Sequence, residues 1–131
     1  NPDKHRYYQA LSALEETGHF GEARDAWQAA LERWPGDAIA LFGMANAELA
    51  LGNFAAAESL YRQLLVQNPA SPAVRNNLAH SLARQGLKPQ AIEQLNLALD
   101  AVLDDEFMRR ELQDSLMEIQ KAPEIQPPVH N

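Results

Sequence analysis

The four histidines are the side chains of this sequence best suited to proton transfer or metal binding, and their spacing supports neither. They are His5, His19, His80 and His130. No two of them are separated as in HxxxH, the spacing that places two ligands on one face of a helix. We interpret them as solvated helix or turn residues, and we predict no metal site and no cofactor.

The carboxylates and hydroxyls give no catalytic set either. A general acid and a general base need a pocket that separates their pKa values, whereas Glu15 with Glu16 and Asp104 with Asp105 fit an exposed helix face or a helix N-terminus. No serine has an adjacent base or a strained turn that would activate it. The absence of cysteine excludes a thiolate nucleophile, disulfides and thiolate metal sites. We predict that the chain is not an enzyme.

Composition restricts the structure and the partners. Hydrophobic residues make up 46% of the 131 positions, with Ala and Leu dominant, which favours an all-α protein. The formal charge of -7, with no basic run longer than Arg109-Arg110, argues against nucleic-acid binding. No apolar stretch is long enough to predict membrane insertion by this domain. Both cytoplasm and periplasm remain open as compartments, and from Asn1 at the first position we expect an excised domain or a processed product.

Three consecutive segments of 34 residues repeat one pattern. The helices that they form must position any binding site in the chain. The segments span 4–37, 38–71 and 72–105. Each has a glycine where one helix turns into the next, a small residue five positions later, and a large residue four positions beyond that. The matching sets are Gly18, Gly52 and Gly86; Ala23, Ala57 and Ala91; and Trp27, Tyr61 and Leu95.

Apolar residues at spacings of three and four, with turn residues between them, predict seven helices. The first six are expected near 4–17, 21–34, 38–51, 54–67, 72–85 and 89–102. After Asp104 and Asp105, which can cap a helix, the stripe Met108, Leu112, Leu116 and Ile119 predicts the seventh. It would cover the apolar face of the last repeat. Residues 122–131 contain three prolines and are expected to form an extended tail.

The repeat resembles the tetratricopeptide repeat family. The matches are Tyr7, Leu14, Gly18, Phe20, Ala23, Trp27, Ala30 and Pro35; Leu41, Ala45, Gly52, Phe54, Ala57, Tyr61 and Pro69; and Leu78, Ala79, Leu82, Gly86, Ala91, Leu95 and Ala98. The resemblance implies a right-handed α-solenoid of three helix-turn-helix hairpins in a domain of residues 1–121, with a capping helix from about 105 to 121. Lys88 departs from the family's aromatic residue, and Leu103 from its terminal proline, which suggests that the sixth helix runs on.

In this family the first helix of each repeat lines a concave groove that holds a peptide or protein. The residues that the register selects include Tyr8, Ser12, Phe42, Asn46, Asn76, Asn77, His80 and Arg84. Asn side chains can pair with a peptide backbone, and Tyr8 and Phe42 offer flat apolar surface. The same register also selects His5, Gln9, Glu15, Ile39 and Gly43, whereas Trp27 and Tyr61 are assigned to the core.

One specialised use of the family's groove is disfavoured. Chaperone-binding members hold a C-terminal carboxylate with a clamp of Lys, Asn and Arg side chains. The corresponding positions here are Tyr8, Ser12, Gly43, Ala73 and Asn77. The clamp is absent, so an acidic C-terminus is not the expected ligand.

Two other interpretations stay open. The chain could form a homodimer through the capping helix, because Phe107 and Met117 lie off its main stripe, or through the tail entering a neighbour's groove. The repeats also look like the C-terminal region of some bacterial papain-like peptidases of the double-glycine type, many of them lipoproteins. In that interpretation this chain would be the non-catalytic repeat domain of a larger bacterial protein.

Overall fold

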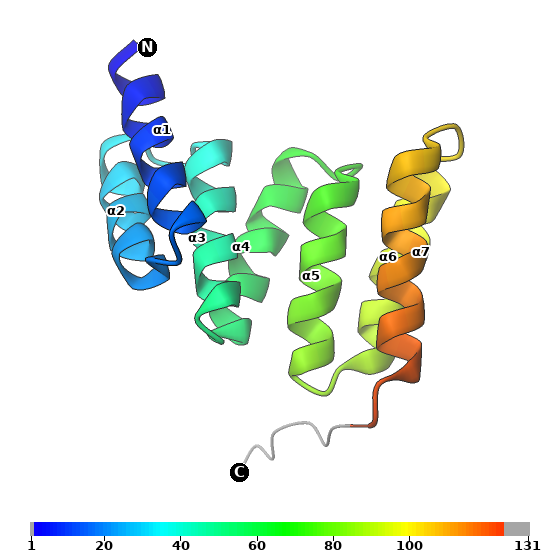
Figure 1. The fold of residues 1–131 in the computed structure, drawn as a ribbon. Helices are drawn as coiled ribbons and strands as arrows, with labels where there is room; N and C mark the ends of the chain where they lie inside the picture. Colours follow the sequence, from blue (N-terminus) through cyan, green and yellow to red (C-terminus); the bar gives the residue numbers. More distant parts are fainter. Residues whose placement is uncertain (1, 125–131) are drawn as a thin grey trace. The chain divides into compact units, whose positions relative to one another are not determined.

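A computed structural model of the chain describes residues 2–124, and all the regular structure in this part is helical (Figure 1). The seven helices are α1 (Pro2–Glu16), α2 (Phe20–Arg33), α3 (Ala38–Ala50), α4 (Phe54–Gln67), α5 (Pro72–Arg84), α6 (Lys88–Ala101) and α7 (Glu106–Lys121). The predicted all-α class and the seven helices are confirmed. Residues 125–131, most of the predicted tail, lie outside the described residues.

The in-register glycines end the first helix of each hairpin. Gly18, Gly52 and Gly86 have φ angles of 80°, 85° and 81°, in the left-handed region that glycine adopts without strain. The amide after each glycine donates back to a carbonyl in the last helical turn, as in His19 N to Leu14 O at 2.8 Å. This bond is the signature of a Schellman motif, which explains why the three turns share one geometry.

The extension of the sixth helix suggested by Leu103 is wrong, because α6 ends at Ala101. The amide of Val102 bonds to Leu99 O at 3.2 Å, and Arg109 of α7 donates to the same carbonyl at 3.1 Å. Asp105 then accepts from Met108 N at 3.0 Å and begins α7. The hydrogen bond from Arg109 of α7 therefore holds the C-terminal end of α6, and α6 ends without the proline that is typical of the family.

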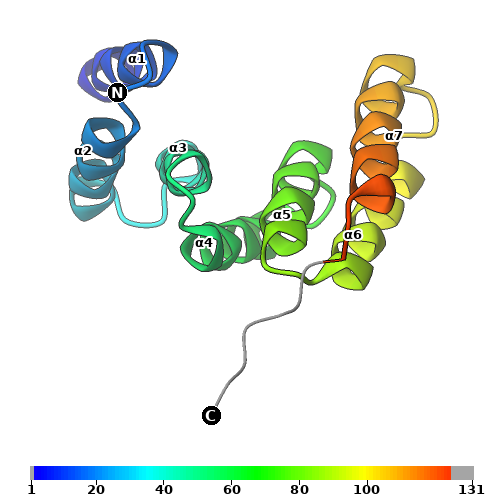
Figure 2. The ribbon, with the colours of Figure 1, turned by 60° about the horizontal axis from the view of Figure 1, so that its bottom comes forward.

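Packing divides the chain into two units, Asn1–Leu60 and Tyr61–Asn131, with the boundary inside α4. In the first unit α2 packs on both α1 and α3, and α1 also touches α3 (Figure 2). Its core is a cluster of buried residues: Tyr8, Leu11, Ala23, Trp27, Ala30 and Ala40. The alanines allow close approach of the helices, while Trp27 and Tyr8 fill the space between them.

In the second unit α5, α6 and α7 lie side by side in both views (Figures 1 and 2), and each contacts the other two. Its core contains Tyr61, Leu78, Leu82, Leu95 and Leu112, all at most 1% exposed. Leu112 and Ile119 insert the apolar side of α7 into this core, and burial of each is worth about 1.5–3 kcal/mol. As predicted, α7 therefore packs on the last hairpin, formed by α5 and α6, and covers its apolar face.

Candidate functional site

A groove of about 400 Å³ lies between α1 and α3 in the first unit. Its lining consists of ten residues: His5, Tyr8, Gln9, Ser12, Glu15, Trp27, Ile39, Phe42, Gly43 and Asn46. The α1 members recur at helical spacings, as do Ile39, Phe42, Gly43 and Asn46 on α3, so each helix presents one face to the groove. Most of the exposed lining surface is apolar.

The floor of the groove is the indole of Trp27, which belongs to α2 and is only 2% exposed. It reaches the groove because position 43 has no side chain. A Cβ built on Gly43 would lie 2.2 Å from a ring carbon of Trp27. The indole N–H donates to Glu15 Oε1 at 2.8 Å, which fixes the ring and orients the Glu15 carboxylate.

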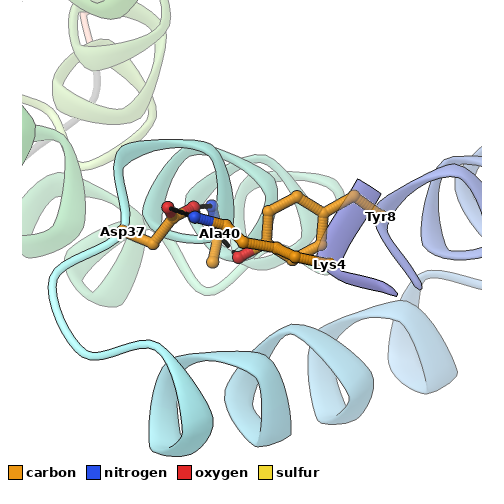
Figure 3. Close-up of polar contacts among 4 residues, drawn as sticks. All are labelled: Lys4, Tyr8, Asp37 and Ala40. Carbon is orange, nitrogen blue, oxygen red and sulfur yellow. Dashed lines mark hydrogen bonds and ion pairs between the residues drawn. The ribbon is translucent and has the colours of Figure 1, made fainter. Parts of the chain in front are cut away.

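One end of the groove is held by Asp37, the N-cap of α3 (Figure 3). Its carboxylate accepts the amide of Ala40 at 3.1 Å and the Tyr8 hydroxyl at 3.0 Å, and it forms an ion pair with Lys4. Lys4 and Tyr8 are one turn apart on α1 and therefore reach the same carboxylate. Through these contacts Asp37 sets the position of α1 against the start of α3.

The contacts of this network shift the pKa values of Asp37 and Tyr8 in opposite directions. Burial alone would raise the pKa of Asp37, but hydrogen bonds from Lys4, Ala40 N–H and Tyr8, with the Lys4 charge, hold it below its ordinary value. Burial raises the pKa of Tyr8 to about 12, helped by its hydrogen bond to Asp37 and by the charge of that carboxylate. At neutral pH an ionised Asp37 therefore accepts from a neutral Tyr8.

Aromatic packing supports the Tyr8 ring. It lies 5.0 Å from the Trp27 ring, measured between centroids, and 5.7 Å from Trp34, in an edge-to-face arrangement with the latter. The ring of Tyr7 lies 5.9 Å from that of Trp34 and 6.4 Å from that of Tyr8, again between centroids. Tyr8 is 6% exposed, so it lines the groove with a small part of a rigid, packed ring.

The charges around the groove favour some ligands over others. Among its lining residues the only carboxylate is Glu15, and none is Lys or Arg. The large apolar surface comes from Ile39, which is 60% exposed, and from half-buried Phe42. Such a site can accommodate apolar side chains and a neutral or basic segment, whereas an acidic segment would find no Lys or Arg in the lining to compensate its charge.

Of the predicted site residues, the structure brings Tyr8, Ser12, Phe42 and Asn46 together in this groove. The Ser12 hydroxyl is already bonded to Tyr8 O at 3.1 Å, within α1. The family register did not place Trp27, Lys4 or Asp37 at the site. Trp27 has the buried position expected of it, and it reaches the groove only because Gly43 leaves it uncovered.

The other four predicted residues lie on α5, in the second unit. The side chain of Asn77 is hydrogen-bonded to the hydroxyl of buried Tyr61. His80 Nε2 lies 3.2 Å from Ser115 Oγ of α7. Half-buried Asn76 has a buried Oδ1 for which no partner is found within residues 2–124.

Two of these α5 residues line a second, smaller hollow, of about 110 Å³, near the end of α7. Its lining includes His80, Arg84, Lys88, Glu118 and Ile119. Lys88, which replaces the aromatic residue expected in the third repeat, donates to Ala122 O at 2.9 Å. The departure from the family pattern therefore ties α6 to the C-terminal end of α7.

The part of the chain that the structure describes contains neither a metal-binding cluster nor a membrane-spanning helix. Over residues 2–124 no group of three or more His, Asp or Glu side chains is placed to hold a metal ion. In the same residues no helix has both the length and the apolar character required to cross a membrane.

Comparisons with known proteins agree on the fold. The sequence model of the tetratricopeptide repeat family matches residues 8–72 and 42–105. Among curated proteins, none matches the chain significantly.

Solved structures with the same fold are distant in sequence. The Yersinia enterocolitica type III secretion chaperone SycD, in complex with a peptide of the translocator YopD, is 18% identical, with 92% of this chain and 94% of that chain covered and a TM-score of 0.82. PcrH from Pseudomonas aeruginosa is 15% identical, with 92% and 93% covered and a TM-score of 0.83. The second such domain of human RPAP3, in complex with the HSP70 peptide SGPTIEEVD, is 13% identical, with 88% and 93% covered and a TM-score of 0.77.

Proposed function

The chain belongs to the tetratricopeptide repeat family, and we propose that it is a protein–protein interaction module that binds a peptide segment of its partner in the groove between α1 and α3. The observation that carries the proposal is the groove itself, with an apolar lining, a Trp27 floor and an edge fixed by Asp37. SycD and the RPAP3 domain, which have the same fold, are each in complex with a peptide. No catalytic step is assigned to the site.

The groove favours an extended segment with at least one large apolar side chain. That side chain would lie against Phe42 and Ile39, over the Trp27 indole, where it loses contact with water. Asn46 and Gln9 provide amide groups that suit a peptide backbone. A single short groove supports an affinity of about 1 µM or weaker, because ordering a free peptide offsets much of the contact energy.

The groove disfavours an acidic peptide terminus. The clamp positions are occupied by Tyr8, Ser12 and Gly43 in this unit, and Glu15 adds a negative charge to the lining. The HSP70 peptide SGPTIEEVD, which is bound by the RPAP3 domain, is therefore expected to bind this chain at least about tenfold more weakly than a neutral peptide that fits the groove.

A displayed library of random peptides tests the proposal without knowledge of the natural partner. The library is selected on the wild-type chain, and each enriched peptide is then measured against Phe42→Ala and against Val66→Ala. Val66 is 84% exposed on α4 and is not among the groove residues, so its variant is a matched apolar deletion.

The expected result is enrichment of peptides with apolar residues, whose dissociation constants rise at least about tenfold for Phe42→Ala and stay unchanged for Val66→Ala. Peptides that bind wild type and Phe42→Ala equally would overturn the assignment of the groove. Failure to enrich any peptide would overturn the peptide-binding function. For the α5 residues Asn76, Asn77, His80 and Arg84, contact with a ligand stays a prediction, which alanine variants measured on the same peptides would test.

A further inference from the structure

The side of α7 that points away from the core exposes two large apolar side chains. Phe107 is 74% exposed and Met117 is 50% exposed, while Leu112, Ser115 and Ile119 on the other side of the helix are buried. Folding of this unit therefore uses only one side of α7. The exposed pair is not explained by the capping of the last hairpin.

These two residues belong to one continuous stripe. Phe107, Arg110, Asp114, Met117 and Lys121 follow one another at spacings of three, four, three and four. Residues at these spacings line one face of a helix, and the alternation is that of the seam between two paired helices. All five are exposed. The stripe is thus a narrow surface with apolar and charged positions in a defined order.

Within residues 2–124 the two central charges of the stripe, Arg110 and Asp114, form no ion pair. They are four residues apart, close enough for an ion pair along the helix. Both side chains are exposed and can be reached by an outside partner.

Read in the opposite direction, the stripe places an apolar residue against each apolar residue and an opposite charge against each central charge. Positions 107 and 117 are equally distant from Leu112, and so are positions 110 and 114. If two identical helices run antiparallel about a two-fold axis at that level, Phe107 of one copy faces Met117 of the second copy, and Arg110 faces Asp114. An interface of this isologous kind needs only one self-complementary surface.

We propose that two copies of this chain associate through antiparallel pairing of their α7 stripes. The aromatic ring of Phe107 against the thioether of Met117 supplies apolar contact at both ends of the seam, and two Arg110–Asp114 ion pairs set the register between them. A parallel pair would place Arg110 against Arg110 and Asp114 against Asp114, and repulsion excludes it. The lining of the groove between α1 and α3 contains no residue of α7, so the two proposed contacts use different residues.

The dimer is expected to be weak. The stripe of a single 16-residue helix buries less than about 1,200 Å², the low end for specific interfaces. A dissociation constant between about 10 µM and 1 mM is the range to search.

Sedimentation equilibrium of the full chain over that range, with charge variants, tests the pairing. Arg110→Asp alone sets Asp against Asp across the axis, and Asp114→Arg alone sets Arg against Arg. Each is expected to weaken self-association at least about tenfold. A mixture of the two variants is complementary at both sites and should associate, and so should the double variant R110D/D114R. Unchanged helical circular dichroism confirms that the exposed substitutions leave the fold intact.

Three results would overturn the proposal. The first is a wild-type chain that stays monomeric up to about 1 mM. The second is association that neither single reversal changes, which would place the interface elsewhere. The third is association lost in a chain ending at Glu124, since that chain keeps all of α7 and lacks only residues 125–131; the tail would then be the contact. The expected result for the shortened chain is the wild-type dissociation constant.

Discussion

The indole of Trp27 occupies the space that a side chain at position 43 would need: a Cβ on Gly43 would lie 2.2 Å from the ring. Gly43→Ala must therefore displace the indole or α3. We expect a loss of about 1–3 kcal/mol in the free energy of unfolding, the usual cost of overpacking. Chemical denaturation followed by circular dichroism measures it.

Gly21→Ala is the matched control. Gly21 lies inside α2, and a Cβ added there meets nothing within 4 Å. Alanine has the higher helix propensity, so this variant should be stabilised by up to about 1 kcal/mol. Equal effects of the two substitutions would show that contact with Trp27 does not set the requirement for glycine at position 43.

The Asp37 network predicts a stability that depends on acid pH. Because the folded protein holds the pKa of Asp37 below its ordinary value of 3.8, the ionised carboxylate stabilises the fold above that pH, and this stabilisation is lost as pH falls through the lowered pKa. Asp37→Asn keeps an N-cap but loses the charge that Lys4 pairs with. Thermal unfolding from pH 7 to pH 2 should show a wild-type advantage that narrows below about pH 4. A constant gap over this range would contradict the assignment.

At alkaline pH the same network acts through Tyr8. Its pKa is raised to about 12, so the neutral hydroxyl stabilises the folded state fully below the ordinary value of 10.0, and this stabilisation is lost as pH rises toward 12. Tyr8→Phe removes one titrating group and should make the alkaline loss of stability less steep, while buried Tyr61, whose pKa is also raised, still contributes to that loss. If wild type and Tyr8→Phe lose stability in parallel between pH 9 and pH 12, Tyr8 is not the group responsible.

Asn77 is predicted to matter for folding as well as for binding. Its side chain is the hydrogen-bond partner of Tyr61, whose ring is fully buried and whose pKa is raised by that burial. Asn77→Ala leaves the buried hydroxyl without this partner and should cost about 1–3 kcal/mol. A double-mutant cycle with Tyr61→Phe measures the coupling. A coupling near zero would mean that the bond does not contribute.

The fold could be predicted from sequence because the repeat constrains it locally. The glycines at 18, 52 and 86 permit the positive φ that each turn needs, and the apolar spacing defines each helix to within about two residues. Asp105 was expected as a cap of α7 and is one. By contrast, the end of α6 depends on the hydrogen bond from Arg109 to Leu99 O. This is a contact between two helices, and the apolar spacing within either helix does not predict it.

The site was harder to predict, for a related reason. Helix registers indicate which face a residue occupies, and Phe42 and Asn46 were selected in this way. They do not indicate that Lys4 and Tyr8 would both reach Asp37, 33 and 29 residues away. Nor do they show that Trp27 would reach the groove through the gap at Gly43, since that depends on how closely two backbones approach. Pairing of side chains across helices is set by tertiary packing.

Amide chemical-shift mapping distinguishes peptide binding in the α1–α3 groove from binding elsewhere on the chain. A peptide selected on the wild-type chain is titrated into ¹⁵N-labelled protein. We expect the largest shifts at Tyr8, Ser12, Phe42 and Asn46, with a further change at the Trp27 indole N–H. If the resonances of these residues stay unchanged while others shift on addition of the peptide, the peptide binds elsewhere and the groove is not its site.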